Sequence, residues 1–315
     1  MKKECVDYLE FHWIVSQNYT YLKNVYNIME KNYQNQNERD ITIYINQESP
    51  FDIIFEKVTN MNLDIKFGVD ALYDRLFISY YFKGEITIVT DTEKGLTVAR
   101  ISNSFKEKNK QLFLGGIIRK HLLRHFIYAG YCVYHAAAII DKINNATILI
   151  LGLSGTGKTT FALDAVKSGR YKLISEDKVI FDPAMGIVYG NSFVHIKQED
   201  LNKFANIVND VVLINGGNTQ RKYQACINKE NYCHYGKVNK VIILNQNYND
   251  ENSFCKIIID KSEIKKLIKY TQQDIYLSTE SKKKEDAIKI LLNYPVFELY
   301  RNSKDRSFQI YEEQI

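Results

Sequence analysis

A glycine-rich segment near the middle of the chain has residue types and a spacing that suit the binding of phosphate groups. It starts at Gly152, reads Gly-Leu-Ser-Gly-Thr-Gly-Lys-Thr-Thr, and matches the pattern G-x-x-x-x-G-K-[ST]. Glycines let the backbone wrap a phosphate chain without Cβ clashes, while converging amides and a following helix N-terminus attract the anion. The sequence therefore predicts a phosphate loop that binds a nucleoside triphosphate through Gly152, Ser154, Gly155, Thr156, Gly157, Lys158, Thr159 and Thr160.

Two side chains of this phosphate loop have predicted roles of their own. The Lys158 ammonium can reach the β- and γ-phosphates, and the Thr159 hydroxyl can ligate Mg²⁺. The apolar run 146–151 predicts a buried strand that enters the loop, and residues 160–167 predict a helix that leaves it. Because such a loop contacts phosphates rather than the base, ATP, GTP and pyrophosphate all stay open as phosphate donors at this point.

Two adjacent carboxylates, Glu176 and Asp177, lie between two apolar runs that predict strands. Carboxylates next to buried strands are costly unless a cation neutralises them, and Mg²⁺ bound to a triphosphate would do so. One carboxylate can then hold the metal or its water while the other takes the proton of an attacking hydroxyl. An ordinary polar turn is the alternative, which the position after loop, helix and strand disfavours.

Hairpin geometry predicts a histidine beside the start of the phosphate loop. Residues 131–140 and 146–151 predict two antiparallel strands joined by a turn centred near Ile143. Paired residues then sum to about 287 by the two-residue hairpin rule, which puts His135 opposite the start of the loop near Gly152. There an imidazole can donate a hydrogen bond or shuttle a proton. The alternative is an interior histidine satisfied by a backbone carbonyl.

A further candidate lies downstream, in a loop that starts with Gly216-Gly217 and ends at Arg221 and Lys222. Such a loop could close Arg221 over the γ-phosphate, as an arginine does in other phosphoryl transferases. A solvated surface loop explains the same residues equally well.

Composition limits the class of protein. The chain has 315 residues and a net charge of +5, without basic clusters, so nucleic acid is not an expected partner. The five cysteines include no C-x-x-C pair, so we expect a reducing cytoplasm rather than a disulfide framework. No signal peptide and no apolar run of about 20 residues is visible, so no membrane association is expected.

The chain is expected to divide into a β-rich N-terminal subdomain, 1–110, and a catalytic domain, 111–315. Alternating or β-branched runs predict N-terminal strands at 41–45, 63–67, 75–82, 85–90 and 96–101. Residues 111–129 have apolar side chains at helical spacing and predict an amphipathic helix. We expect His121 and His125 on the solvated face of this helix rather than on a metal.

Taken together, His135 in Tyr-His-Ala-Ala-Ala, the phosphate loop, and Leu-Ile-Ser-Glu-Asp-Lys-Val resemble the catalytic domain of the HPr kinase/phosphorylase family and its relatives. The resemblance covers about residues 112–301 and implies an α/β fold with a phosphoenolpyruvate-carboxykinase-type P-loop core. It implies that Asp177 is the general base, and that Glu176 stands where the family has a first Asp and joins Thr159 at Mg²⁺. It also implies proton transfer or phosphate contact by His135, and it matches Arg221 to a basic loop position.

The chain also departs from that family. The Glu-x-Arg-Gly-hydrophobic-Gly signature of true HPr kinases is absent, which argues against HPr as the substrate. The chain looks more similar to the stand-alone relatives found in peptide natural-product pathways. The amino-acid sequence of the loop also resembles that of ATP-dependent phosphoenolpyruvate carboxykinase, but the chain is short for that enzyme. In addition, Glu-Asp-Lys-Val starting at Glu176 replaces the expected Asp-Asp-Glu-His.

The expected function is therefore ATP- and Mg²⁺-dependent transfer of the γ-phosphate to a serine hydroxyl of a peptide or protein, with a ribosomal natural-product precursor as the leading acceptor. Two alternatives stay open: a small-molecule kinase acting on free serine or a similar alcohol, and a nucleotide-binding regulator without transfer activity. The resemblance also makes a homo-oligomer possible, because this enzyme family often assembles into rings.

Overall fold

The computed structural model divides the chain into two compact units, Met1–Ala129 and Gly130–Ile315. Each unit is described by itself. The structure describes residues 2–6, 9–15, 39–45, 69–73, 76–81, 85–102, 117, 120–214, 222–247, 254–257, 262, 265, 281–302 and 308. Among the helices described, none is both long and apolar enough to cross a membrane.

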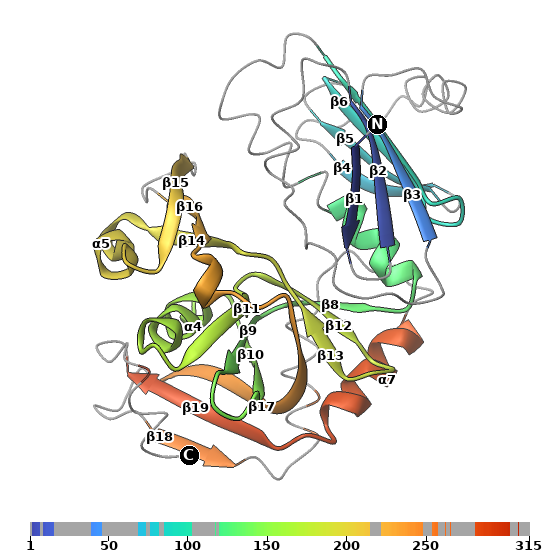
Figure 1. Ribbon diagram of the computed structural model, residues 1–315. Helices are drawn as coiled ribbons and strands as arrows, with labels where there is room; N and C mark the ends of the chain where they lie inside the picture. Colours follow the sequence, from blue (N-terminus) through green and yellow to red (C-terminus); the bar gives the residue numbers. More distant parts are fainter. Residues whose placement is uncertain are drawn as a thin grey trace. The chain divides into compact units, whose positions relative to one another are not determined.

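The first unit contains a seven-stranded sheet in the order β1-β2-β3-β7-β6-β5-β4, drawn in blue to cyan in Figure 1. Strand β3 pairs in parallel with both β2 and β7, and the other neighbours are antiparallel. The predictions at 41–45, 75–82, 85–90 and 96–101 are confirmed, and the one at 63–67 lies outside the described residues. The strands are β1 (Lys2–Val6), β2 (Leu9–Val15), β3 (Arg39–Ile45), β4 (Val69–Tyr73), β5 (Leu76–Tyr81), β6 (Ile86–Asp91) and β7 (Leu96–Ile101).

A helix over residues 120–128 packs its polar side chains into this first unit. His121 Nδ1 lies 2.8 Å from Thr90 Oγ1, and its Nε2 lies 2.8 Å from Ser79 Oγ. His125 Nε2 lies 2.9 Å from Thr97 Oγ1. Both histidines are buried, so the predicted solvated face is wrong. Hydroxyls of β5, β6 and β7 provide the hydrogen bonds that burial of an imidazole requires.

These contacts also explain where the chain divides. The boundary was predicted after residue 110, whereas the compact units meet after Ala129. The predicted catalytic domain includes the helix over 120–128. In the structure this helix is hydrogen-bonded to strands of the first unit.

The second unit is built on a nine-stranded mixed sheet with the path β11-β9-β10-β17-β13-β12-β8, and β19 pairs with both β17 and β18. The pairs β10–β17 and β17–β19 are parallel, and the others are antiparallel. The strands are β8 (Cys132–His135), β9 (Ala137–Asp141), β10 (Thr147–Gly152), β11 (Tyr171–Ser175), β12 (Lys178–Asp182), β13 (Ile187–Tyr189), β17 (Tyr235–Asn247), β18 (Phe254–Ile257) and β19 (Val296–Asn302).

A separate three-stranded sheet in the same unit has the order β14-β16-β15. Its strands are β14 (Phe193–Lys197), β15 (Val208–Ile214) and β16 (Lys222–Ile227), and both neighbouring pairs are antiparallel. The labelled helices of the second unit are α4 (Lys158–Lys167), α5 (Leu201–Phe204) and α7 (Ser281–Leu291), with short 3₁₀ turns η3 (Gln198–Asp200) and η4 (Lys229–Asn231).

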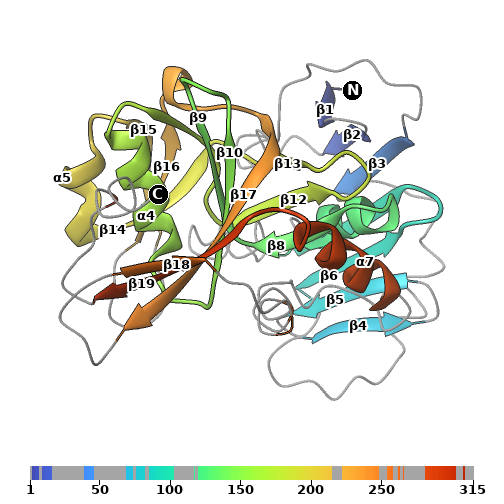
Figure 2. The same ribbon diagram turned by 90° about the horizontal axis from the view of Figure 1, so that it is seen from below.

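Strand β10 is central because it is buried on both faces. Ile148 and Ile150 belong to a core cluster that includes α4, whereas Leu149 and Leu151 belong to a cluster that includes α7. Successive side chains of a strand point to opposite faces, so a continuous apolar run serves both cores. Figure 2 shows α4 and α7 on opposite sides of β10 and β17. This packing holds the end of β10, where the phosphate loop starts, in a fixed place.

The hairpin that leads into β10 has the predicted register. Thr147 pairs with Ile140, and Ile150 pairs with Ala137, so each pair sums to 287 as expected. The first predicted strand is nevertheless divided at Ala136 into β8 and β9. Strand β8 leaves the hairpin and pairs with β12.

The division corrects the predicted place of His135. His135 pairs with Lys178, and Gly152 pairs with Leu244 of β17, so His135 does not lie opposite Gly152. The amide of Ala136 donates to the carbonyl of Asp177 at 3.3 Å, which links the break in the strand to the acid pair, Glu176 and Asp177.

The hairpin turn is tied to the end of α4 by an ion pair. Asp141 Oδ2 accepts from Arg170 Nη2 at 2.7 Å and from Nε at 3.0 Å, and Oδ1 accepts from the Ile143 amide at 2.8 Å. Burial alone would raise the pKa of Asp141, but the hydrogen bonds from Arg170 and Ile143 and the charge of Arg170 hold it below its ordinary value.

We predict that Asp141→Asn lowers the free energy of unfolding by about 1–3 kcal/mol at neutral pH, because the Arg170 hydrogen bonds lose their charged acceptor. Folding lowers the pKa of Asp141, so the wild-type advantage is complete above the unfolded pKa and is lost as the pH falls through the folded one. Urea unfolding at neutral and acidic pH measures both effects.

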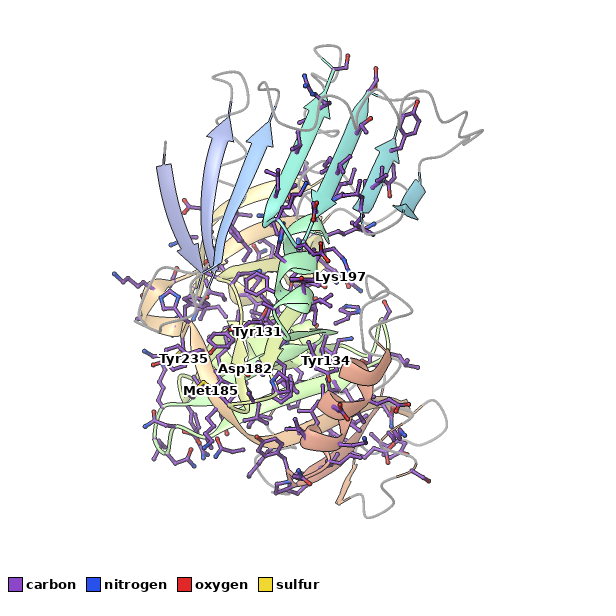
Figure 3. All side chains as sticks on the ribbon, turned by 90° about the vertical axis from the view of Figure 1, so that its right-hand side faces the viewer. Tyr131, Tyr134, Asp182, Met185, Lys197 and Tyr235 are labelled. Carbon is purple, nitrogen blue, oxygen red and sulfur yellow. The ribbon has the colours of Figure 1, made fainter. Side chains whose placement is uncertain are left out.

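Asp182→Asn is the matched control. Asp182 Oδ1 accepts the amides of Ala184 and Met185 in the turn after β12, and Figure 3 labels Asp182 and Met185 there. An Asn oxygen can accept the same bonds, so a small effect is expected. An Asp141→Asn protein as stable as wild type at neutral pH would contradict the assigned role of the ion pair.

Candidate active site

The phosphate loop joins β10 to α4, and glycine is required where it starts and where it ends. Gly152 has φ +153°, and a Cβ there would lie 2.7 Å from both the Leu244 carbonyl oxygen and Thr156 Oγ1. Gly157 precedes α4 with φ 88°, in the left-handed region. The helix predicted from residue 160 starts at Lys158, so Lys158 and Thr159 lie in its first turn.

Within the loop, Ser154 and Gly155 are exposed, whereas Thr156 is buried and its hydroxyl donates to the Leu153 carbonyl at 2.9 Å. Thr160 is half-buried in the first turn of α4. All of the predicted phosphate-binding residues therefore lie together at the N-terminus of one helix, where the helix dipole favours an anion.

Lys158 is buried, and its side chain folds back onto the loop. Its Nζ donates to the carbonyl oxygens of Gly152 at 2.8 Å and Leu153 at 3.0 Å. Burial is the main reason that the pKa of Lys158 falls to about 8, and the charges of Asp177 and Glu176 only partly oppose it. A phosphate anion would favour the charged ammonium, so ligand binding and protonation of Lys158 should be coupled.

The first residue of the acid pair lies against the first turn of α4. Thr159 Oγ1 donates to Glu176 Oε2 at 2.6 Å, and Glu176 is 3% exposed. The structure thus brings together Thr159 and Glu176, the two residues predicted to hold the metal.

Sequence reasoning missed a third participant, His195 of β14. Its backbone amide donates to Glu176 Oε1 at 2.8 Å, and its ring Nδ1 lies 2.7 Å from the same oxygen. No local pattern indicates this contact, because His195 is a single histidine in a short strand of the other sheet. Only the tertiary fold brings β14 to the turn between β11 and β12.

The second residue of the acid pair faces two basic side chains. Asp177 Oδ1 lies 3.5 Å from His135 Nε2 and 3.3 Å from Lys178 Nζ. The pKa of His135 is lowered first by burial and then by the charge of Lys158, which favours a neutral imidazole near pH 7. His135 therefore lies beside Asp177 through the pairing of β8 with β12, rather than opposite Gly152 as the hairpin geometry predicted.

Arg221 lies outside the described residues, since β15 ends at Ile214 and the described part of the chain resumes with β16 at Lys222. Its predicted contact with a γ-phosphate stays a prediction.

The residues fit a triphosphate and Mg²⁺. A Cβ at Gly152 would meet the Leu244 carbonyl oxygen and Thr156 Oγ1, so glycine lets the loop turn tightly as it leaves β10. The oxygen atoms available to a metal ion are the Thr159 hydroxyl and the Glu176 carboxylate, and Mg²⁺ prefers such hard oxygen ligands. Lys158 adds a cation that can face phosphate oxygens.

Residues 82–208 match the family model described as phosphoenolpyruvate carboxykinase. The matched segment spans less than half of the chain and includes the phosphate loop, the acid pair, His135 and His195. Within this segment the structure has, in chain order, the β9–β10 hairpin, the phosphate loop, α4 and the acid pair. The chain contains a phosphoenolpyruvate-carboxykinase-type P-loop core. The predicted fold, which comprises a β-rich region and an α/β core of this type, is confirmed.

Among solved structures, the chain is similar to the HPr(Ser) kinase/phosphatase from Coxiella burnetii. The identity is 10%, the TM-score is 0.30, and the alignment covers 57% of this chain and 94% of that one. A likeness at this level says nothing about activity or substrate. No curated protein matches the sequence significantly. The predicted similarity to relatives in peptide natural-product pathways stays a prediction.

We predict that nucleotide affinity falls as the pH rises through about 8, the pKa of Lys158 in the free protein. Below that pH the ammonium is charged before the ligand arrives, whereas above it binding must take up a proton. Affinity should then fall by up to about tenfold per pH unit. Calorimetric titration with ADP from about pH 7 to about pH 9.5, in buffers of different ionisation enthalpy, measures both the affinity and the number of protons taken up on binding.

Lys158→Met is the control, because it keeps a long side chain without a titrating group. It should bind ADP more weakly and without the pH dependence. Equal pH dependence in the variant and the wild type would show that another group is responsible.

Proposed function

We propose that the protein is an ATP- and Mg²⁺-dependent kinase that transfers the γ-phosphate to a serine hydroxyl of a peptide or protein. The observation that supports this most strongly is the arrangement of the acid pair beside the phosphate loop. Glu176 accepts the Thr159 hydroxyl, while Asp177, 23% exposed, lies beside His135 and Lys178. One acid thus faces the loop, and the other is available to an incoming substrate.

In this proposal the loop amides and Lys158 hold the triphosphate. Lys158 exchanges its bonds to the Gly152 and Leu153 carbonyls for bonds to phosphate oxygens. Mg²⁺, held through Thr159 and Glu176, would neutralise charge on the phosphates of the bound nucleotide. ATP is the proposed donor because the matched family model is that of the ATP form of phosphoenolpyruvate carboxykinase.

Asp177 acts as the general base. As the serine oxygen forms its bond to the γ-phosphorus, the bond from that phosphorus to the β–γ bridging oxygen breaks and ADP leaves. The hydroxyl proton passes to the Asp177 carboxylate. His135, whose pKa is lowered by burial, is neutral near pH 7 and lies 3.5 Å away, so it can take this proton onward. Lys178 Nζ, 3.3 Å from Asp177 Oδ1, places a positive charge beside this carboxylate.

Phosphorylation is proposed rather than decarboxylation, although the matched family is a carboxykinase. Lys178 and Val179 follow the acid pair where the resemblance calls for Glu-His, and Lys178 directly contacts Asp177. Although Lys178 and Val179 replace Glu-His, the acid pair itself is present. It provides the groups that a phosphotransferase needs: one carboxylate near the metal site and a second carboxylate near the acceptor.

We predict that Asp177→Asn lowers the rate of phosphotransfer by about 10²–10⁴-fold while ADP binding changes little, because a general base contributes about that much. Intact-mass spectrometry of reactions with ATP and Mg²⁺ measures the transfer. The acceptors are free serine, HPr and short serine peptides encoded beside the gene. Asp182→Asn, which lies away from the acid pair in the turn after β12, is the matched control.

The pattern of products distinguishes the remaining functions. Phosphate on a peptide supports the proposal, and phosphate on free serine alone would identify a metabolite kinase. ATP binding without a phosphoester on any acceptor would favour a nucleotide-binding regulator. Transfer by Asp177→Asn at the wild-type rate would contradict the assignment of the base.

A further inference from the structure

The carboxylate beside the phosphate loop is held by a residue from a different sheet. Glu176 lies in the turn between β11 and β12 of the nine-stranded sheet, whereas His195 lies on β14 of the three-stranded sheet. Two donors of His195, the backbone amide and ring Nδ1, reach the same oxygen of Glu176 at 2.8 and 2.7 Å.

The strand position of His195 explains why its amide is available. In the antiparallel pair β14–β16, His195 lies opposite Gln224. Strand β14 is at the edge of its sheet, so one side of it faces away from β16. On that side the amide of His195 donates to the Glu176 carboxylate, which gives this edge N–H a hydrogen-bond acceptor.

The double contact fixes how Glu176 faces the phosphate loop. An ionised carboxylate oxygen has about two acceptor positions, so His195 fills those of Oε1. The other oxygen, Oε2, then points to Thr159 and accepts its hydroxyl at 2.6 Å. This bond directs the hydroxyl proton toward Glu176, so that the lone pairs of Thr159 Oγ1 face away from the carboxylate.

We propose that His195 is a positioning residue for the metal-bound nucleotide. By holding Glu176 Oε1, it directs Oε2 toward Thr159 and keeps the Thr159 lone pairs available to a divalent cation. The inference rests on the nucleotide and metal site of the proposed function. It requires neither phosphotransfer nor any particular acceptor.

A purely structural role makes a different prediction. If His195 only joined the two sheets, its loss would lower the stability of the protein and weaken nucleotide binding equally with and without metal. A positioning role concerns the metal-dependent part of the affinity, because the loop amides and Lys158 contact phosphates without help from Glu176.

The test compares ADP affinity in Mg²⁺ with ADP affinity in EDTA by calorimetry, together with direct Mn²⁺ binding to the ADP complex by electron paramagnetic resonance. His195→Ala should lower Mn²⁺ affinity by about 10–100-fold, the usual effect of removing a residue that orients a metal ligand. ADP affinity in EDTA should stay within about twofold of wild type, because the phosphate contacts of the loop and Lys158 are unchanged.

Two further variants make the result specific. His195→Asn keeps the backbone amide and places a side-chain N–H near the position of Nδ1, so it should restore most of the metal affinity. Lys197→Ala is the matched control on the same face of β14. Lys197, labelled in Figure 3, is exposed and lies 3.7 Å from Glu199, so neither affinity should change.

Wild-type Mn²⁺ affinity in a folded His195→Ala protein would overturn the inference, as would equal losses of ADP affinity with and without metal. If His195→Ala does not fold, the His195→Asn protein decides. The inference is supported if this variant melts at the same temperature as the wild type and binds Mn²⁺ with the wild-type affinity. A loss of Mn²⁺ affinity of about 10–100-fold overturns it. Wild-type protein whose ADP affinity is unaffected by Mg²⁺ would overturn the proposed metal site itself, and the wild type alone reveals that failure.

Discussion

The burial of the Glu176 carboxylate is the constraint on which the rest of the site depends. A carboxylate that is 3% exposed loses most of its hydration, which costs several kcal/mol unless hydrogen bonds or positive charge replace it. The structure replaces it with donors from two directions: the Thr159 hydroxyl from the first turn of α4, and His195 from β14. One side chain therefore connects the phosphate loop, the main sheet and the smaller sheet.

The main sheet determines where this carboxylate meets the loop. Strand β10 pairs in parallel with β17 up to Gly152, where the loop leaves the sheet against Leu244. Strand β12 starts at Lys178, directly after the acid pair, and pairs with β8 at His135. The end of β10 and the start of β12, which are distant in sequence, are thus both positioned by the main sheet at the candidate site. Lys158, His135 and the acid pair then lie close enough for their charges to affect one another.

Much of this arrangement follows from local sequence patterns. The apolar run into Gly152, the spacing of the glycines and the hairpin register are all short-range features, and each predicted pair in β9–β10 forms. The departure of His135 from the hairpin could not be predicted, because residues 131–140 are apolar apart from His135 and contain no glycine or proline that would mark a break. The switch of partners at Ala136 depends on β12, which comes much later in the chain.

Two other errors have the same physical origin. Helical spacing placed His121 and His125 on the polar face, and polar faces usually lie in water. Hydroxyls on β5, β6 and β7 bury that face instead, and no pattern within the helix reports partners on distant strands. His195 was missed for the same reason: its partner, Glu176, is 19 positions away and on another sheet.

The account depends most on the claim that the loop and Glu176 form one site for a nucleoside triphosphate and its metal. A crystal structure with a non-hydrolysable ATP analogue and Mn²⁺, located by its anomalous signal, tests this directly. The account predicts the phosphates within the loop, Lys158 turned from the Gly152 carbonyl to a phosphate oxygen, and Mn²⁺ bound to Thr159 Oγ1. A triphosphate bound elsewhere, or Mn²⁺ away from both Thr159 and Glu176, would contradict it.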